Sequence, residues 1–93
     1  MIASFADKET EQFWLTGKSR RFPADVKVRA FRKLQMLDAA ATLNFLRVPP
    51  SNQLEKLKGD RQHYYSIRVN QQWRLCFVWR ENEAHNVMFV DYH

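Results

Sequence analysis

The spacing of apolar residues changes near the middle of this 93-residue chain, and the change constrains its fold more than any other feature. Before Pro49-Pro50, large apolar residues recur every three or four positions, as Val28, Phe31, Leu34 and Leu37 do. After the prolines, apolar residues alternate with polar ones, as in Tyr65, Ile67 and Val69. The first spacing is typical of helices and the second of strands, so the chain should be helical first and β-rich later.

The first half is predicted to hold a short strand and two helices. Met1 to Phe5 suits a strand, Asp7 is a natural N-cap for the first helix, and Gly17 a natural end. Pro23 opens a second helix, and Ala39 to Leu46 adds a helical turn or continues it until the two prolines. Most basic residues of this helix lie away from its apolar stripe: Lys27, Arg29, Arg32 and Lys33.

The second half is predicted to form antiparallel strands. Residues 65–69 and 73–79 flank the polar turn 70–72 as a hairpin, and both faces of its second strand are largely apolar, which suits a central position. A turn over residues 81–85 precedes a last strand over 86–92. The result is an α+β domain spanning 1–93: one strand, two helices, then three or four antiparallel strands.

Composition and cysteine usage narrow the class of protein. With 45% hydrophobic and 14% aromatic residues the chain should fold. Cys76 is its only cysteine, so no internal disulfide can form, and a reducing cytoplasm is expected. No signal-peptide core or membrane-spanning run is present, so no membrane association is expected.

The formal net charge of +5 makes a polyanionic partner plausible. Residues 1–50 hold nine basic and five acidic side chains, and residues 51–93 hold six and five, so the basic excess belongs to the first half. Charge alone leaves RNA, DNA, an acidic protein and the solvated faces of ordinary helices as alternatives.

Familiar catalytic motifs are absent from the sequence. It contains no Gly-rich phosphate loop, no His-Glu-x-x-His helix and no Cys-x-x-Cys pair. The residues His63, His85, His93 and Cys76 share no metal-ligand spacing, so neither a metal nor another cofactor is expected.

Four segments carry a family resemblance: Leu57-Lys-Gly-Asp-Arg61, Tyr64-Tyr-Ser-Ile-Arg68-Val, Trp73-Arg-Leu-Cys-Phe77 and Val90-Asp-Tyr-His93. In this order and spacing, the chain resembles the HigB branch of the RelE-like toxins over essentially its whole length. The resemblance implies a RelE-like fold, in which an N-terminal strand and a two-helix hairpin pack on a curved antiparallel sheet of about four strands.

The resemblance also implies an activity and partners. Such toxins are metal-independent endoribonucleases that cut messenger RNA on the ribosome. The ribose 2′-hydroxyl attacks the neighbouring phosphate, leaving a 2′,3′-cyclic phosphate and a 5′-hydroxyl. A HigA-type helix-turn-helix antitoxin would restrain the toxin, and operator DNA would be reached only through that antitoxin. The nucleophile belongs to the substrate, so the protein supplies orientation, proton transfer and charge stabilisation.

The resemblance also implies catalytic roles for the residues that match the family's motifs. Lys58 and Arg74 would stabilise the phosphate, although each could instead pair with Asp60 or Asp91 as a surface cation. In the terminal motif, His93 would transfer protons near neutrality, with Asp91 orienting it and Tyr92 stacking on a base. The structural alternatives are a frayed C-terminal tail for this motif and a simple core aromatic for Tyr92.

One position departs from the family, because Glu55 stands where some HigB members carry a histidine. A carboxylate with a raised pKa could act as the base, but it would also repel RNA. Four further arginines are candidates for RNA phosphates or for solvated surface: Arg20, Arg21, Arg61 and Arg68. A catalytically silent RNA-binding or co-repressor module and a ribosome-independent ribonuclease remain as rival functions.

Overall fold

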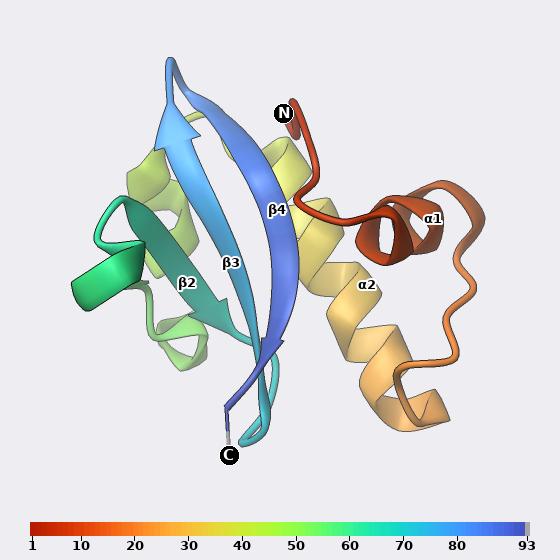
Figure 1. Ribbon diagram of the computed structural model, residues 1–93. Coiled ribbons are helices and arrows are strands. Elements are labelled where there is room, and N and C mark those ends of the chain that lie inside the picture. The colour runs from red at the N-terminus through yellow and green to blue at the C-terminus, as the bar shows by residue number, and fades with distance from the viewer. Residues whose placement is uncertain (93) are drawn as a thin grey trace.

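The computed structural model describes residues 1–92, in which two α-helices precede a four-stranded antiparallel sheet (Figure 1). The helices are α1 (Lys8–Thr16) and α2 (Ala24–Ala39), and the strands, in sheet order, are β1 (Glu55–Lys56), β2 (Tyr64–Arg68), β3 (Trp73–Arg80) and β4 (Glu83–Asp91). Short 3₁₀ turns connect them: η1 (Leu43–Arg47), η2 (Pro50–Asn52) and η3 (Gly59–Arg61). The predicted α+β class is confirmed.

The ends of α1 lie where local chemistry places them. The Asp7 carboxylate accepts a hydrogen bond of 2.7 Å from the Thr10 N–H, and Gly17 ends the helix with a φ of 72°, a left-handed conformation that favours glycine. Helix α2 begins directly after Pro23, as predicted, but ends at Ala39. The helical turn predicted over Ala39 to Leu46 is present as the separate 3₁₀ turn η1, which begins at Leu43.

The predicted N-terminal strand is corrected to two isolated parallel bridges with β4, Ile2 to Ala84 and Phe5 to Val87. The ladder between β3 and β4 shifts register between Cys76 and Val78, and Asn86 on β4 has a φ of 51°. Such a bulge twists the strand and breaks the regular pattern of outward backbone groups. The N-terminal segment bonds to this bulge directly, because Ser4 accepts hydrogen bonds from the N–H groups of Asn86 (2.9 Å, to its hydroxyl) and Val87 (3.1 Å, to its carbonyl).

Of the two predicted hairpin turns, one is confirmed and the other is corrected. The polar turn between β2 and β3 is confirmed, because the Asn70 side-chain oxygen accepts hydrogen bonds from the N–H groups of Gln72 (2.9 Å) and Trp73 (2.7 Å). The predicted five-residue turn after β3 is wrong. Only Glu81 and Asn82 form it, with φ values of 56° and 60°, so β4 begins at Glu83. Two consecutive positive φ values match the right-handed twist of a tight hairpin.

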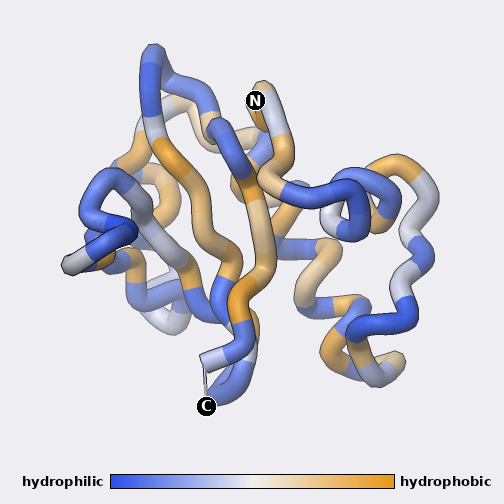
Figure 2. The backbone as a smooth tube through the Cα atoms, in the orientation of Figure 1, coloured by the Kyte–Doolittle hydropathy of each residue, from blue (hydrophilic) through white to orange (hydrophobic). Residues whose placement is uncertain are grey.

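The hydrophobic core lies between the sheet and the two helices, which occupy the same side of the sheet beyond β4 in the view of Figure 1. Figure 2 shows a hydrophobic middle in β3 and a hydrophilic turn between β3 and β4. Helix α2 contributes Val26, Ala30, Leu34 and Leu37. Val28 does not belong to the apolar stripe, since it is 53% exposed. No helix within residues 1–92 is long and apolar enough to cross a membrane.

Strand β3 is central, as predicted, and its two faces differ. Leu75 and Phe77 point into the core, whereas Arg74 and Cys76 are buried but lie outside the core cluster. Successive side chains of a strand point to opposite faces, so these two residues belong to the sheet face away from the helices. A buried arginine there requires polar partners, and these partners define the site.

Candidate active site

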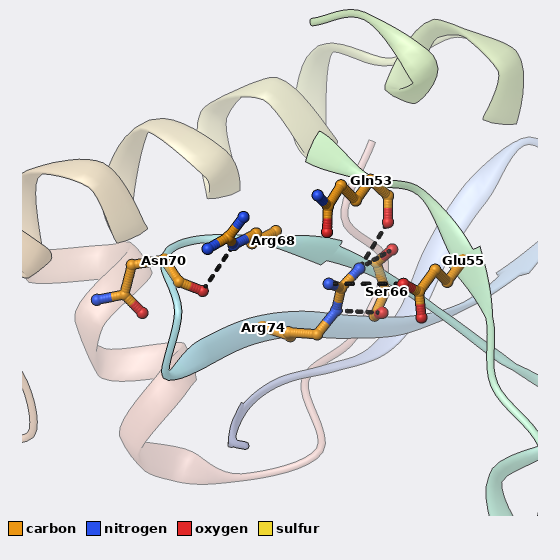
Figure 3. Close-up of polar contacts among 6 residues, drawn as sticks. All are labelled: Gln53, Glu55, Ser66, Arg68, Asn70 and Arg74. Atoms are coloured by element: carbon orange, nitrogen blue, oxygen red, sulfur yellow. Dashed lines mark hydrogen bonds and ion pairs between the residues drawn. The ribbon is translucent and has the colours of Figure 1, made fainter. Parts of the chain in front are cut away.

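Arg74 is the centre of the site and is only 8% exposed. Its Nε–H donates a hydrogen bond of 2.8 Å to Ser66 Oγ, and one terminal nitrogen, Nη2, donates to the Gln53 carbonyl at 2.6 Å and to the Ser66 carbonyl at 3.4 Å (Figure 3). Strand β2 supplies Ser66 directly opposite Cys76, and the loop after η2 supplies Gln53. These contacts fix the plane of the guanidinium.

The other terminal nitrogen of Arg74, Nη1, lies 3.9 Å from a carboxylate oxygen of Glu55 (Figure 3). Glu55 sits on the edge strand β1 opposite Ser66, and its side chain is largely exposed. A separation of 3.9 Å between these atoms is that of an ion pair, because it is too long for a hydrogen bond. One edge of the guanidinium is therefore held by the protein, while the other faces a carboxylate that an anionic ligand could displace.

Tyr92 covers the same face of the sheet farther along. Its phenol makes a side-chain hydrogen bond with the buried thiol of Cys76, and its backbone N–H donates to the Gln72 carbonyl at 2.5 Å. Burial raises the pKa of the Cys76 thiol to about 11, although the nearby positive charges of Arg61 and Arg74 oppose this. The thiol stays protonated at neutral pH, so it is not a nucleophile.

The phenol of Tyr92 is held protonated as well. Burial raises its pKa, and the neighbouring Cys76 adds to that effect, while Arg74 and Arg61 oppose it. Tyr92 is nevertheless 41% exposed, so its ring remains accessible on the surface. Because its ionisation responds to Arg74, Arg61 and Glu55, these residues share one electrostatic environment. The structure thus brings together four of the predicted site residues.

Two further members of the predicted catalytic set, Asp91 and Lys58, lie among the described residues. Asp91 ends β4, and its carboxylate accepts a hydrogen bond of 3.1 Å from the Gln72 side chain. Lys58 is exposed at the start of η3, where it lines a shallow depression of about 460 Å³ together with His63. His93 lies outside the described residues. Within residues 1–92, no three His, Cys, Asp or Glu side chains are grouped to hold a metal ion.

Of three further arginines predicted to bind RNA, two lie apart from Arg74 and one lies directly opposite it. Arg21 forms a 2.9 Å ion pair with Glu9 and stacks 5.9 Å from the Trp73 ring, which packs on the helix side of the sheet with Phe22. Arg20 lines a separate depression beside α1. The third, Arg68, lies opposite Arg74 in the β2–β3 register, but its Nε–H donates to the Asn70 carbonyl at 3.1 Å (Figure 3).

Sequence reasoning missed the residues that hold Arg74. Ser66 falls between two apolar residues of a strand, and a small hydroxyl in that position signals only a change of face. Gln53 contributes through its backbone carbonyl, which any residue would offer, so its identity carried no signal. Cys76 was given no role in the site, although its alternation with Arg74 placed both on one face.

The fold and the site define a small α+β protein with a fixed arginine and a protonated phenol on one face of its sheet. The same fold occurs in the YoeB-YefM complex from Staphylococcus aureus, with a TM-score of 0.62 at 20% identity over all of this chain and 98% of that one.

A family model described as the RelE-like toxin of the type II toxin-antitoxin system HigB matches residues 3–93. Toxin HigB-1 of Vibrio cholerae serotype O1 is 43% identical over 100% of this chain and 98% of its own length. Endoribonuclease HigB of Proteus vulgaris is 33% identical over the full length of both. The chain belongs to the HigB-like toxin family, and the RelE-like fold implied by the sequence is confirmed.

Proposed function

We propose that this toxin is an endoribonuclease that cuts messenger RNA on the ribosome. Membership of the toxin family and the relative named Endoribonuclease HigB support the enzyme class. The observation that carries the proposal is the Arg74 guanidinium, which three hydrogen bonds hold in place while Nη1 makes only a 3.9 Å ion pair with the exposed carboxylate of Glu55. A fixed cation of this kind stabilises charge that develops in a transition state without first having to be oriented.

The proposed reaction is an internal transfer at phosphorus. The ribose 2′-oxygen forms a bond to the adjacent phosphorus, and the bond from phosphorus to the 5′-oxygen breaks. The 2′-hydroxyl loses its proton to a base, and the leaving 5′-oxygen gains one from an acid. The products are a 2′,3′-cyclic phosphate and a 5′-hydroxyl, and no water or metal is consumed in this step.

The residues of the site divide these tasks. Arg74 and Arg61, whose charges both act on the Tyr92 hydroxyl, stabilise the negative charge on the non-bridging oxygens, and Lys58 is assigned the same role. Tyr92 offers an exposed ring for base stacking and a protonated hydroxyl for hydrogen bonding. His93 transfers protons near neutrality, and Asp91 orients it.

Glu55 is the proposed alternative base. Its carboxylate is 3.9 Å from Arg74 Nη1, on the side where the phosphate would bind. That placement suits removal of the 2′-proton, but the same charge competes with the phosphate for Arg74. We assign proton transfer first to His93 and give Glu55 this role only if His93 proves dispensable.

The partners follow from the same proposal. A HigA-type helix-turn-helix antitoxin neutralises the toxin and alone contacts operator DNA, while the toxin meets the ribosome and messenger RNA in the cytoplasm. Arg61 and Arg68 are the proposed phosphate contacts closest to the active site, and Arg20 and Arg21 belong to a more distant surface. The gene beside this one is expected to encode the antitoxin.

The decisive experiment compares purified toxin on messenger RNA bound to translating ribosomes with toxin on the same RNA alone. We expect cleavage only on ribosomes, with 2′,3′-cyclic phosphate and 5′-hydroxyl ends identified by mass spectrometry. Equal cleavage of naked RNA would indicate a ribosome-independent ribonuclease. RNA binding with no cleavage in either sample would indicate a catalytically silent module.

A further inference from the structure

A basic groove of about 740 Å³ runs between α2 and the β2–β3 turn, which we call the α2 groove. Four cationic side chains line it: Arg29, Arg32, Lys33 and Arg68. None of its lining residues is acidic. Arg74 does not line the groove, because Gln53 and Ser66 hold its guanidinium (Figure 3). The groove adjoins the Arg74 site through Arg68, which lies opposite Arg74.

The cations of the α2 groove are not neutralised by the protein. Across the described residues 1–92, ion pairs form at Arg21 and Arg74, not at the exposed Arg29 and Arg32. Lys33 donates a hydrogen bond of 2.5 Å to the neutral Asn52 side chain, and both burial and the charge of Arg29 lower its pKa. Mutual repulsion of this kind is relieved when an anionic partner binds.

An apolar surface continues from the groove. Met36 lines both the α2 groove and a cleft of about 360 Å³, which we call the apolar cleft. Beside Met36, the cleft is formed by Ala39, Ala40, Phe45, Leu46 and Val48. Phe45 is 65% exposed and Val48 is 70% exposed, which is unusual for large apolar side chains that lie side by side. One surface therefore joins unpaired cations to an uncovered apolar patch.

We propose that the α2 groove and the apolar cleft together bind the antitoxin, through a polypeptide segment that carries several carboxylates followed by aliphatic side chains. Carboxylates would pair with Arg29 and Arg32, and the aliphatic side chains would cover Phe45 and Val48. An RNA backbone would match the groove, but its phosphates and ribose offer nothing for the aliphatic cleft, so the two-part surface favours a polypeptide. The inference rests on the proposed toxin function, since it names the partner of that toxin.

A direct binding test uses two fluorescein-labelled probes, a peptide of four glutamates, two alanines and two leucines, and a twelve-nucleotide uridine RNA. Anisotropy is measured with wild-type toxin, the R29E/R32E double variant and Phe45→Ser. Affinity for the peptide should fall about tenfold or more in the R29E/R32E and Phe45→Ser variants. A K8E/R80E variant, which has the same charge change as R29E/R32E but elsewhere on the surface, should bind the peptide as wild type does. Failure of wild type to bind the peptide, or loss of RNA affinity alone in R29E/R32E, would overturn the proposal.

A second test separates this inference from the proposed function. The toxin and the antitoxin encoded beside it are co-expressed, and growth and complex formation are measured. R29E/R32E should still arrest growth when expressed alone, but the antitoxin should no longer rescue growth or co-purify. Full rescue of R29E/R32E would overturn the docking surface. If wild type alone is not toxic, the proposed function fails, while the peptide measurement still decides whether this surface binds an acidic chain.

Discussion

Successive residues of β3 point to opposite faces of the sheet, and the two faces have different roles. Leu75 and Phe77 fill the core against the helices, while Arg74 and Cys76 lie under Tyr92 and the Gln53 loop on the other face. Apolar residues are stabilised wherever they leave water, whereas each buried polar group needs a specific partner. One face therefore tolerates exchange of similar side chains, and the other depends on the exact atoms present.

The largest effect is expected from Arg74→Ala, which removes the fixed cation and leaves the core face untouched. Cleavage of ribosome-bound messenger RNA should fall about a thousandfold, the scale seen when one transition-state donor is lost. Arg74→Lys should recover little, because a point charge cannot reproduce the two-sided grip of a guanidinium. Circular dichroism would verify folding of both variants, and near-normal cleavage by a folded alanine variant would make Arg74 purely structural.

Leu75→Ala tests the neighbouring residue on the opposite face. Leu75 is completely buried, so the free energy of unfolding should fall by about 3 kcal/mol through lost burial and a cavity. Cleavage per folded molecule should change less than twofold. Denaturant titration measures the free energy of unfolding, and single-turnover cleavage at low temperature measures the activity of the folded protein. A large loss of activity in fully folded protein would show that the two faces are not independent.

Deletion of His93 tests proton transfer. If its imidazole serves as the acid or base, cleavage on ribosomes should fall about a hundredfold, and His93→Gln should behave like the deletion. The melting temperature should stay the same in both variants. Unchanged cleavage would move the proton transfer to Glu55, which Glu55→Gln would then test in the same assay.

The smallest effect concerns the pH dependence of stability at Cys76. Its pKa in the folded protein is about 11, above the ordinary value of 9.0, so the folded state favours the protonated thiol. That contribution is complete below pH 9 and is lost as the pH rises through 11. Between these values, wild type should lose on the order of 2 kcal/mol more than Cys76→Ser. Parallel urea titrations at several pH values measure this difference, and identical slopes would contradict it.

The sequence allowed prediction wherever a short-range rule was decisive. Asp7 and Gly17 bounded α1, Asn70 marked the β2–β3 turn, and the position of Arg74 in an apolar strand indicated a buried cation at the candidate site. Each of these depends on one residue and its immediate neighbours, which a single sequence contains.

Features set by distant packing could not be predicted. Val28 has helical spacing but lies on the exposed side of α2, because the orientation of the helix depends on which residues the sheet accepts. The ion pair of Arg21 with Glu9, twelve residues earlier, and its position over Trp73 likewise depend on packing between distant segments. The bulge at Asn86, to which the N-terminal segment is hydrogen-bonded, had no recognisable sequence signal.

That pairing has a consequence for how the toxin is made. Ala3 donates its N–H to the Ala84 carbonyl at 2.7 Å, and Ala6 donates to the Val87 carbonyl at 2.9 Å. During synthesis the first residues emerge long before their partners, because Ile2 pairs with Ala84 and Phe5 with Val87. Contacts so distant in sequence form late. The sheet that carries Arg74 and Tyr92 therefore cannot be completed on a nascent chain until β4 has been translated, so the candidate active site is assembled late in synthesis.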